Sequence, residues 1–183
     1  MLGLPFEAID VDLMRGEHKR AEFLALNPFG QVPVIDDGGS VVADSNAILT
    51  YLALRYGAPS WLPRDALGAA RVQRWLSVAA GPLAYGTARA RVLVLFGRPD
   101  DPKDAIAAAH ALFRTMEHAL AASPYLAGDA PTIADIALYT YTAHAPEGNV
   151  ALQDYPALRA WLARIEALPG FVPMRASKVG LAA

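Results

Sequence analysis

The chain has 183 residues, of which 54% are hydrophobic and 19% are charged, so it can bury a sizeable core in one large domain or two small ones. Its net charge is −2, and the sequence contains no block of basic residues. There is therefore no electrostatic reason to expect nucleic acid or an anionic membrane as a partner. The lack of cysteine excludes disulfides, cysteine metal sites and a cysteine nucleophile. Without a signal-peptide pattern or a membrane-length apolar run, we expect a soluble cytoplasmic protein.

The first predicted elements are a strand and a short helix. Apolar and acidic residues alternate over residues 6–13, which predicts a strand with one irregularity. Residues 17–26 follow as a helix with Phe23, Leu24 and Leu26 on its inner side.

A hairpin and a second helix come next. Residues 27–30 hold the turn formers Asn, Pro and Gly, and the β-branched run at residues 32–35 predicts a strand. Residues 37–39 fit a tight turn, and residues 40–43 form the return strand. Asp44-Ser45 then supplies the N-cap of a helix, so the first 57 residues run strand, helix, strand, strand, helix.

Pro33 is unusual because a proline within a strand cannot donate a hydrogen bond to the sheet. A cis Val32-Pro33 bond would turn the main-chain groups of Val32 outward, where an extended peptide could pair with them. The following helix begins with free N–H groups, the hydroxyl of Ser45 and the carboxylate of Asp44, which suit an amino-acid head group. Together these features predict a site for a small peptide with a free amino-acid end.

The rest of the chain reads as linker and helices. Residues 58–65 contain two prolines and a helix-start signal, and form the linker. Residues 66–183 follow as a helical domain, whose first helix runs over residues 66–96 or breaks near Gly81-Pro82. Further helices are expected over residues 103–121, 132–143 and 156–168. In the third of these four, Thr132 and Asp135 form a capping box with a structural role.

Three motifs in this order resemble the glutathione transferase family: Gln31-Val32-Pro33, Asp44-Ser45-Asn46-Ala47-Ile48 and Thr132-Ile133-Ala134-Asp135. The resemblance implies an α/β thioredoxin-like glutathione-binding domain over residues 1–57, followed by an all-α helical domain over residues 66–183. It further implies a transferase that uses glutathione as co-substrate, conjugates its thiol to a small hydrophobic electrophile, and forms a homodimer. No metal is implied, and we interpret the four histidines, His18, His110, His118 and His144, as non-ligands.

The resemblance also implies roles for individual residues in the glutathione site. Val32 would pair main chain to main chain with the cysteinyl unit of glutathione, next to a cis Pro33. Asp44 and Ser45 would hold the γ-glutamyl end, and Gln31 would line the site. Asp44 is shorter than the Glu or Gln that family members more often carry there.

Other candidates concern the glycine carboxylate and the thiol. Arg15, His18 and Lys19 are the cations in the right region for the carboxylate, and we select Lys19. Tyr85 and Arg89 lie one turn apart on the helix that lines the electrophile pocket in the family, where an arginine could lower a thiol pKa. The alternative is that both residues only pack and solvate that helix.

The N-terminus departs from the family pattern, in which the domain starts one strand and one helix earlier. That segment normally carries the Tyr, Ser or Cys that activates the thiol, so we leave the catalytic residue unassigned. Residues 1–5 look like the tail of the missing helix, and either Met1 is internal to a longer protein or the chain has repacked. An alternative function is a non-enzymatic interaction module whose open sheet edge recruits another strand. A disulfide-exchange enzyme would lack its nucleophilic cysteine.

Overall fold

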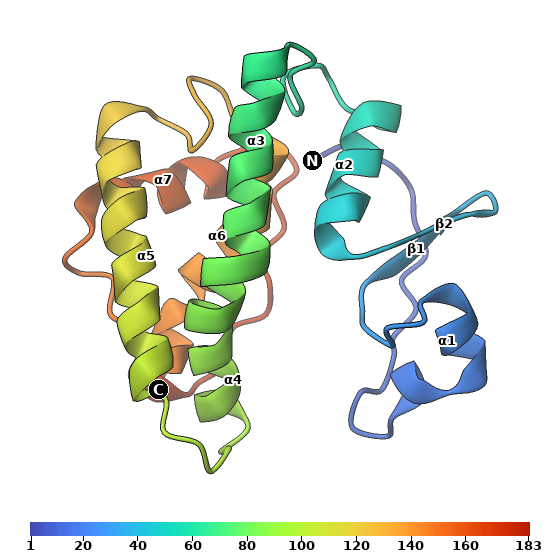
Figure 1. The fold of residues 1–183 in the computed structure, drawn as a ribbon, viewed down its shortest axis with the longest axis horizontal. Coiled ribbons are helices and arrows are strands. Elements are labelled where there is room, and N and C mark those ends of the chain that lie inside the picture. Colours follow the sequence, from blue (N-terminus) through green and yellow to red (C-terminus); the bar gives the residue numbers. More distant parts are fainter.

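The computed structural model describes residues 1–183 and places a small α/β part beside a larger bundle of helices (Figure 1). The elements of the α/β part are η1 (Glu17–Lys19), α1 (Ala21–Leu26), β1 (Val34–Asp37), β2 (Ser40–Ala43) and α2 (Ser45–Tyr56). The elements of the bundle are α3 (Ala66–Val78), η2 (Ala79–Ala88), α4 (Arg89–Leu95), α5 (Lys103–Ala122), α6 (Ile133–Ala143), η3 (Ala145–Gly148), α7 (Pro156–Glu166) and η4 (Gly180–Ala182). No helix has both the length and the apolar character needed to cross a bilayer.

The strand predicted over residues 6–13 is wrong. The chain has no regular structure there, and the sheet consists of β1 and β2 alone. Phe6 is 87% exposed and Ile9 is 80% exposed, so the alternating pattern buries neither of these large side chains. A strand needs a partner for its hydrogen-bond ladder, and no neighbouring strand offers residues 6–13 an edge.

The hairpin is an antiparallel pair in which Val34 lies opposite Ala43. Its turn is built on two glycines in the left-handed region, which suits a tight two-residue turn. The carboxylate of Asp37 at the end of β1 accepts hydrogen bonds from the hydroxyls of Tyr51 and Tyr56 on α2, at 2.7 and 2.6 Å. These bonds, from Tyr56 first and then Tyr51, lower the pKa of Asp37, and they tie α2 to the hairpin.

The sequence predicts either a continuous helix or a break near Pro82, and the structure shows a third arrangement. Residues Ala79–Ala88 form a π-helical segment, η2, between α3 and α4, and Pro82 lies inside it. Proline lacks an N–H and its ring clashes with the carbonyl four residues earlier in an α-helix. The wider π turn accommodates Pro82 while the helix axis continues.

The hydrophobic core lies in the bundle. Its largest fully buried side chains include Trp161, Phe113, Met116 and Leu138, which come from three helices, α5, α6 and α7. The core helices match the predicted ranges to within a few residues at each end.

The capping box that begins α6 is confirmed. The N–H of Ala134 donates to the Thr132 hydroxyl at 3.2 Å, and the N–H of Thr132 donates to Asp135 at 2.8 Å. Asp135 is fully buried and also accepts from the N–H of Leu126 and from Nε1 of Trp161, both at 2.9 Å. This carboxylate therefore joins a turn and two helices as well as capping one of them.

Two further carboxylates join elements of the bundle. Glu117 on α5 accepts the N–H groups of Ala157 and Leu158, at 2.9 and 2.8 Å, and so caps the start of α7. Glu147 in η3 accepts from Arg91 on α4 at 2.6 Å and from the N–H of Ser177 at 2.9 Å. The second carboxylate fastens the C-terminal segment to the bundle.

Candidate functional site

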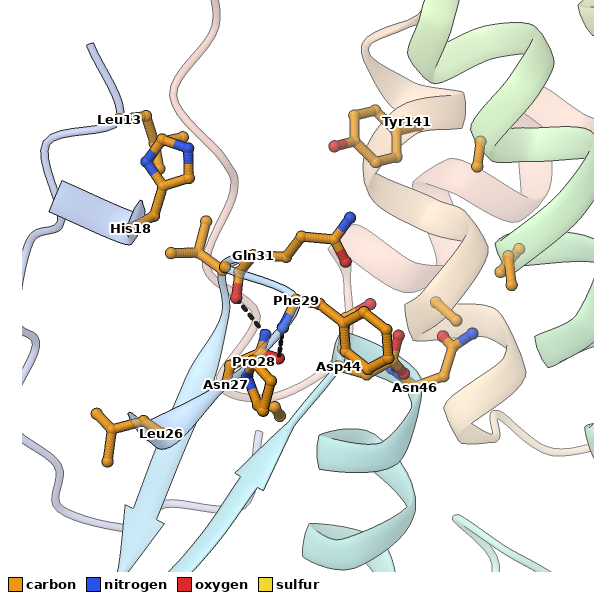
Figure 2. Close-up of a pocket in the computed structure, with 18 of the residues that line it drawn as sticks. Leu13, His18, Leu26, Asn27, Pro28, Phe29, Gln31, Asp44, Asn46 and Tyr141 are labelled. Carbon is orange, nitrogen blue, oxygen red and sulfur yellow. Dashed lines mark hydrogen bonds between the residues drawn. The ribbon is translucent and has the colours of Figure 1, made fainter. Parts of the chain in front are cut away.

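A cleft of about 1010 Å³ opens between the α/β part and the bundle. One side is formed by the loop before β1 and by the start of α2, and the other side by η2 and α6 (Figure 2). Its lining residues include Lys19, Gln31, Val32, Asp44 and Ser45, five of the eight residues predicted for the site. The structure therefore brings residues from both predicted motifs of the α/β part to one cavity.

The loop over residues 27–32 is held by side-chain bonds to its own main chain. The buried Asn27 donates to the carbonyl of Gln31 at 2.7 Å and accepts from the N–H of Phe29 at 3.1 Å (Figure 2). Nζ of Lys19 donates to the carbonyls of Phe29 and Gly30, at 3.3 and 3.0 Å. These bonds fix the wall of the cleft that carries Gln31 and Val32.

Val32 precedes a cis peptide bond to Pro33, as the family resemblance implies. Val32 lines the cleft, and neither its N–H nor its C=O takes part in a hydrogen bond within the chain. Pro33 itself does not line the cleft. The free main chain of Val32 presents one donor and one acceptor, which are the groups that an extended peptide needs for strand-like pairing.

The start of α2 forms the corner of the cleft. Asp44 has a φ of 76°, a left-handed value that is rare for a residue other than glycine. Its Oδ1 accepts from the N–H groups of Asn46 and Ala47, at 2.9 and 3.0 Å, while its Oδ2 accepts no hydrogen bond. The N–H and hydroxyl of Ser45 also have no partner within the chain. The corner thus offers a free carboxylate oxygen and free donors at the positive end of a helix.

The three cations predicted near the glycine carboxylate differ in their position relative to the cleft. The ammonium of Lys19 lines the cleft but already bonds to two loop carbonyls. His18 also lines the cleft, and its Nδ1 is buried without a hydrogen-bond partner. Arg15 does not line the cleft. The assignment of Lys19 to the carboxylate stays a prediction, with His18 beside it.

Tyr85 and Arg89 do not line the cleft. Tyr85 is 74% exposed, and Arg89 forms a solvent-exposed ion pair with Asp100 at 3.5 Å. Their proposed role toward the electrophile stays a prediction. The far wall is built instead by small and apolar side chains of η2, with two residues of α6, and these are Ala79, Ala80, Leu83, Ala84, Ala137 and Tyr141.

Sequence reasoning missed three polar residues at this site. The sequence indicates only a turn former at Asn27, whereas in the structure this residue is buried and shapes the loop. Asn46 donates to the carbonyl of Leu76 on α3 at 3.1 Å, and Tyr141 lines the cleft from α6. The Asn-Pro dipeptide offered a signal for the first residue, whereas the other two become recognisable only when the two parts are placed side by side.

Comparison with known proteins extends over both parts. The description "Glutathione S-transferase, N-terminal domain" fits residues 1–55, and "Glutathione S-transferase, C-terminal domain" fits residues 82–169. Glutathione S-transferase 3 of Zea mays is 37% identical in an alignment that covers 92% of this chain and 81% of the maize protein.

Solved structures agree with this. A crystal structure of a glutathione S-transferase from Pseudomonas fluorescens has a TM-score of 0.86 at 35% identity, with 94% of this chain and 87% of that chain covered. A glutathione transferase homologue from Drosophila mojavensis, described with bound glutathione, has a TM-score of 0.80 at 32% identity, with 92% of this chain and 79% of that one covered. The motifs, the fold and these relatives lead to one conclusion: the chain belongs to the glutathione transferase family.

Proposed function

We propose that this chain is a glutathione transferase, which binds glutathione in the cleft and joins its thiol to a small hydrophobic electrophile. The observation that supports the proposal is that three sets of polar groups without a hydrogen-bond partner lie at the same cleft. These are the main chain of Val32, the donors of Ser45 and the Oδ2 of Asp44. The relatives favour this enzyme over a non-enzymatic interaction module.

In the proposed complex, each part of glutathione meets a complementary group. The N–H and C=O of Val32 pair with the cysteinyl unit, as in an added strand. The γ-glutamyl carboxylate accepts from the N–H and hydroxyl of Ser45, where the dipole of the 12-residue helix α2 favours negative charge. The Oδ2 of Asp44 accepts from the γ-glutamyl ammonium, Gln31 lies alongside, and Lys19 or His18 faces the glycine carboxylate.

The proposed reaction needs an ionised thiol and a nearby acceptor. A free thiol has a pKa of about 8.5, so a modest lowering makes the thiolate abundant near neutral pH. With an aryl halide as acceptor, the sulphur forms a bond to the ring carbon, the carbon–halogen bond breaks, and halide leaves. The thiol proton passes to solvent. The apolar wall formed by η2 is the surface on which such a ring would rest.

Homodimer formation in the cytoplasm completes the proposal. The family resemblance offers two interpretations of Phe29: a local core residue, or an aromatic side chain that inserts into the partner subunit. Its side chain is 81% exposed, so it is not part of the local core. An exposed aromatic ring beside the cleft is consistent with the second interpretation.

Calorimetry with glutathione tests the proposed site. We expect binding heat at millimolar or lower glutathione, and a Kd about tenfold or more higher in Asp44→Asn, because a charge-assisted bond to the ammonium is lost. Asparagine keeps the side-chain oxygen that caps α2, so the helix should stay folded. Asp36→Asn is the matched control, since Asp36 caps the hairpin turn outside the cleft. Absent binding heat, or an equal loss in the control, would remove the site assignment.

A further inference from the structure

Few polar contacts join the two parts that enclose the cleft. Between residues 1–57 and residues 66–183 there are two hydrogen bonds and no ion pair. In one, the exposed N-terminal ammonium of Met1 donates to the carbonyl of Gly170 at 3.0 Å. In the other, Nδ2 of Asn46 donates to the carbonyl of Leu76 at 3.1 Å. Asn46 therefore supplies the side-chain hydrogen bond across the interface.

Asn46 also lines two cavities. It lines the cleft and a second groove of about 480 Å³ between α2 and α3. The second groove is bordered by Thr50 of α2 and by Gln73 and Ser77 of α3. Because an open groove lies beside it, the Asn46 bond spans a place where α2 and α3 are not in close side-chain packing.

The main chain and the side chain of Asn46 form hydrogen bonds on opposite sides of the cleft. Its N–H donates to Oδ1 of Asp44, so its backbone belongs to the corner. Asp44 and Asn46 lie next to each other in Figure 2. The side chain of Asn46 bonds to Leu76, three residues before the π-helical segment that begins at Ala79 and forms the apolar wall. One residue thus connects the corner to the wall across the cleft.

We infer that Asn46 is a positioning residue, which fixes the distance between the glutathione corner and the apolar wall on which the electrophile rests. The inference rests on the proposed function for the meaning of these two surfaces. The corner itself is built by main-chain N–H groups and by Asp44, and does not depend on the Asn46 side chain. Loss of that side chain should therefore spare glutathione binding and impair the alignment of the two reactants.

Kinetic measurements on Asn46→Ala and Asn46→Asp test whether the side chain affects the alignment of the reactants without affecting glutathione binding. For both variants we expect kcat for conjugation of an aryl halide to fall roughly tenfold. For Asn46→Ala, which adds no charge beside the site of the γ-glutamyl carboxylate, the Kd for glutathione should change less than about twofold. Aspartate has the same shape but no donor, so it should be at least as impaired as alanine. Gln73→Ala, on the same groove but without a bond across it, should keep the wild-type kcat. A purely structural role would lower the unfolding temperature and leave kcat unchanged at 25 °C.

A measurement without catalysis gives the second readout. Because the chain has no cysteine, nitroxide labels can be placed at Glu22→Cys on α1 and Arg114→Cys on α5, both exposed. Pulsed electron resonance should give a broader distance distribution between the labels when Asn46→Ala is added, and an unchanged one with Gln73→Ala. An unchanged distribution, an unchanged kcat, or loss of glutathione binding in Asn46→Ala would each overturn the inference. If the wild-type chain binds no glutathione, the proposed function fails, while the label distances still decide whether Asn46 fixes the two parts.

Discussion

Asp135 accepts four hydrogen bonds in a site closed to solvent, from Leu126, Trp161 and both the N–H and hydroxyl of Thr132. Burial raises the pKa of this carboxyl, and the hydrogen bonds oppose that change. Asp135→Ala should lower the free energy of unfolding by about 3 kcal/mol or more, because several buried donors lose their acceptor. Urea denaturation followed by circular dichroism measures the loss.

Two variants make this measurement specific. Asp129→Ala removes an exposed carboxylate from the same loop and should stay within about 0.5 kcal/mol of wild type. Thr132→Ala should cost about 1 kcal/mol, since it removes the cap and leaves the carboxylate in place. If Asp135→Ala costs no more than Thr132→Ala, the carboxylate is only a helix cap.

The residues of the candidate site fall into two groups: those whose place in the site could be predicted from the sequence, and those whose place could not. Val32, Asp44 and Ser45 could be predicted, because strand, proline and N-cap patterns place their main-chain groups locally. The roles of Asn27 and Asn46 could not, because an amide side chain bonds equally well to many carbonyls. Only the folded chain shows that these two amides meet the carbonyls of Gln31 and Leu76.

At the level of elements, Glu147 gives the C-terminal segment a dependence on pH. Burial alone would raise the pKa of Glu147, but hydrogen bonds from the N–H of Ser177, from His144 and from Arg91 lower it below its ordinary value of 4.5. A lowered pKa in the folded state contributes stability above about pH 4.5, and this contribution is lost as pH falls through the folded-state pKa.

The expected outcome is a difference in the pH dependence of stability between wild type and the Glu147→Gln variant. Wild type should lose stability on acidification below pH 4.5 relative to Glu147→Gln, which cannot titrate at that position. Thermal unfolding of both proteins at each pH measures this difference, in which the titration of Asp135 and other groups cancels. Parallel stability curves across that range would show that the cluster around Glu147 does not carry the dependence.

Most elements could be predicted from sequence because their signals are local. The return strand over residues 40–43 and the helix after Asp44 follow turn and cap patterns. The strand expected over residues 6–13 failed because alternation describes a segment, whereas a strand also needs a neighbour. The π-helical segment around Pro82 was missed because the choice between a break and a wider turn depends on what packs against the helix.

At the level of the whole molecule, we expect a homodimer that uses Phe29. Analytical ultracentrifugation should give about twice the chain mass of 19.5 kDa for wild type, and more monomer for Phe29→Ala. Phe6→Ala removes an equally exposed aromatic ring from the N-terminal segment and should leave the assembly unchanged. A wild-type monomer at micromolar concentration, or equal effects of both variants, would contradict this prediction.

The arrangement of the two parts was predictable only through the family resemblance. Composition and periodicity indicate an α/β part and a helical part, but they contain no information about which surfaces meet. The cleft depends on that meeting, because one wall comes from α2 and its preceding loops and the other from η2 and α6. For the same reason, sequence spacing alone did not identify Ala80, Ala84 or Tyr141 as wall residues.

The cap of α7 has a consequence for the order in which the chain assembles. This helix starts at Pro156 and has no side-chain cap of its own, and its first free N–H groups are bound by Glu117 from α5. Its Trp161 likewise finds its acceptor on α6. Nascent α7 therefore gains these stabilising partners only after α5 and α6 have formed beside it, and we expect it to be a late participant in folding.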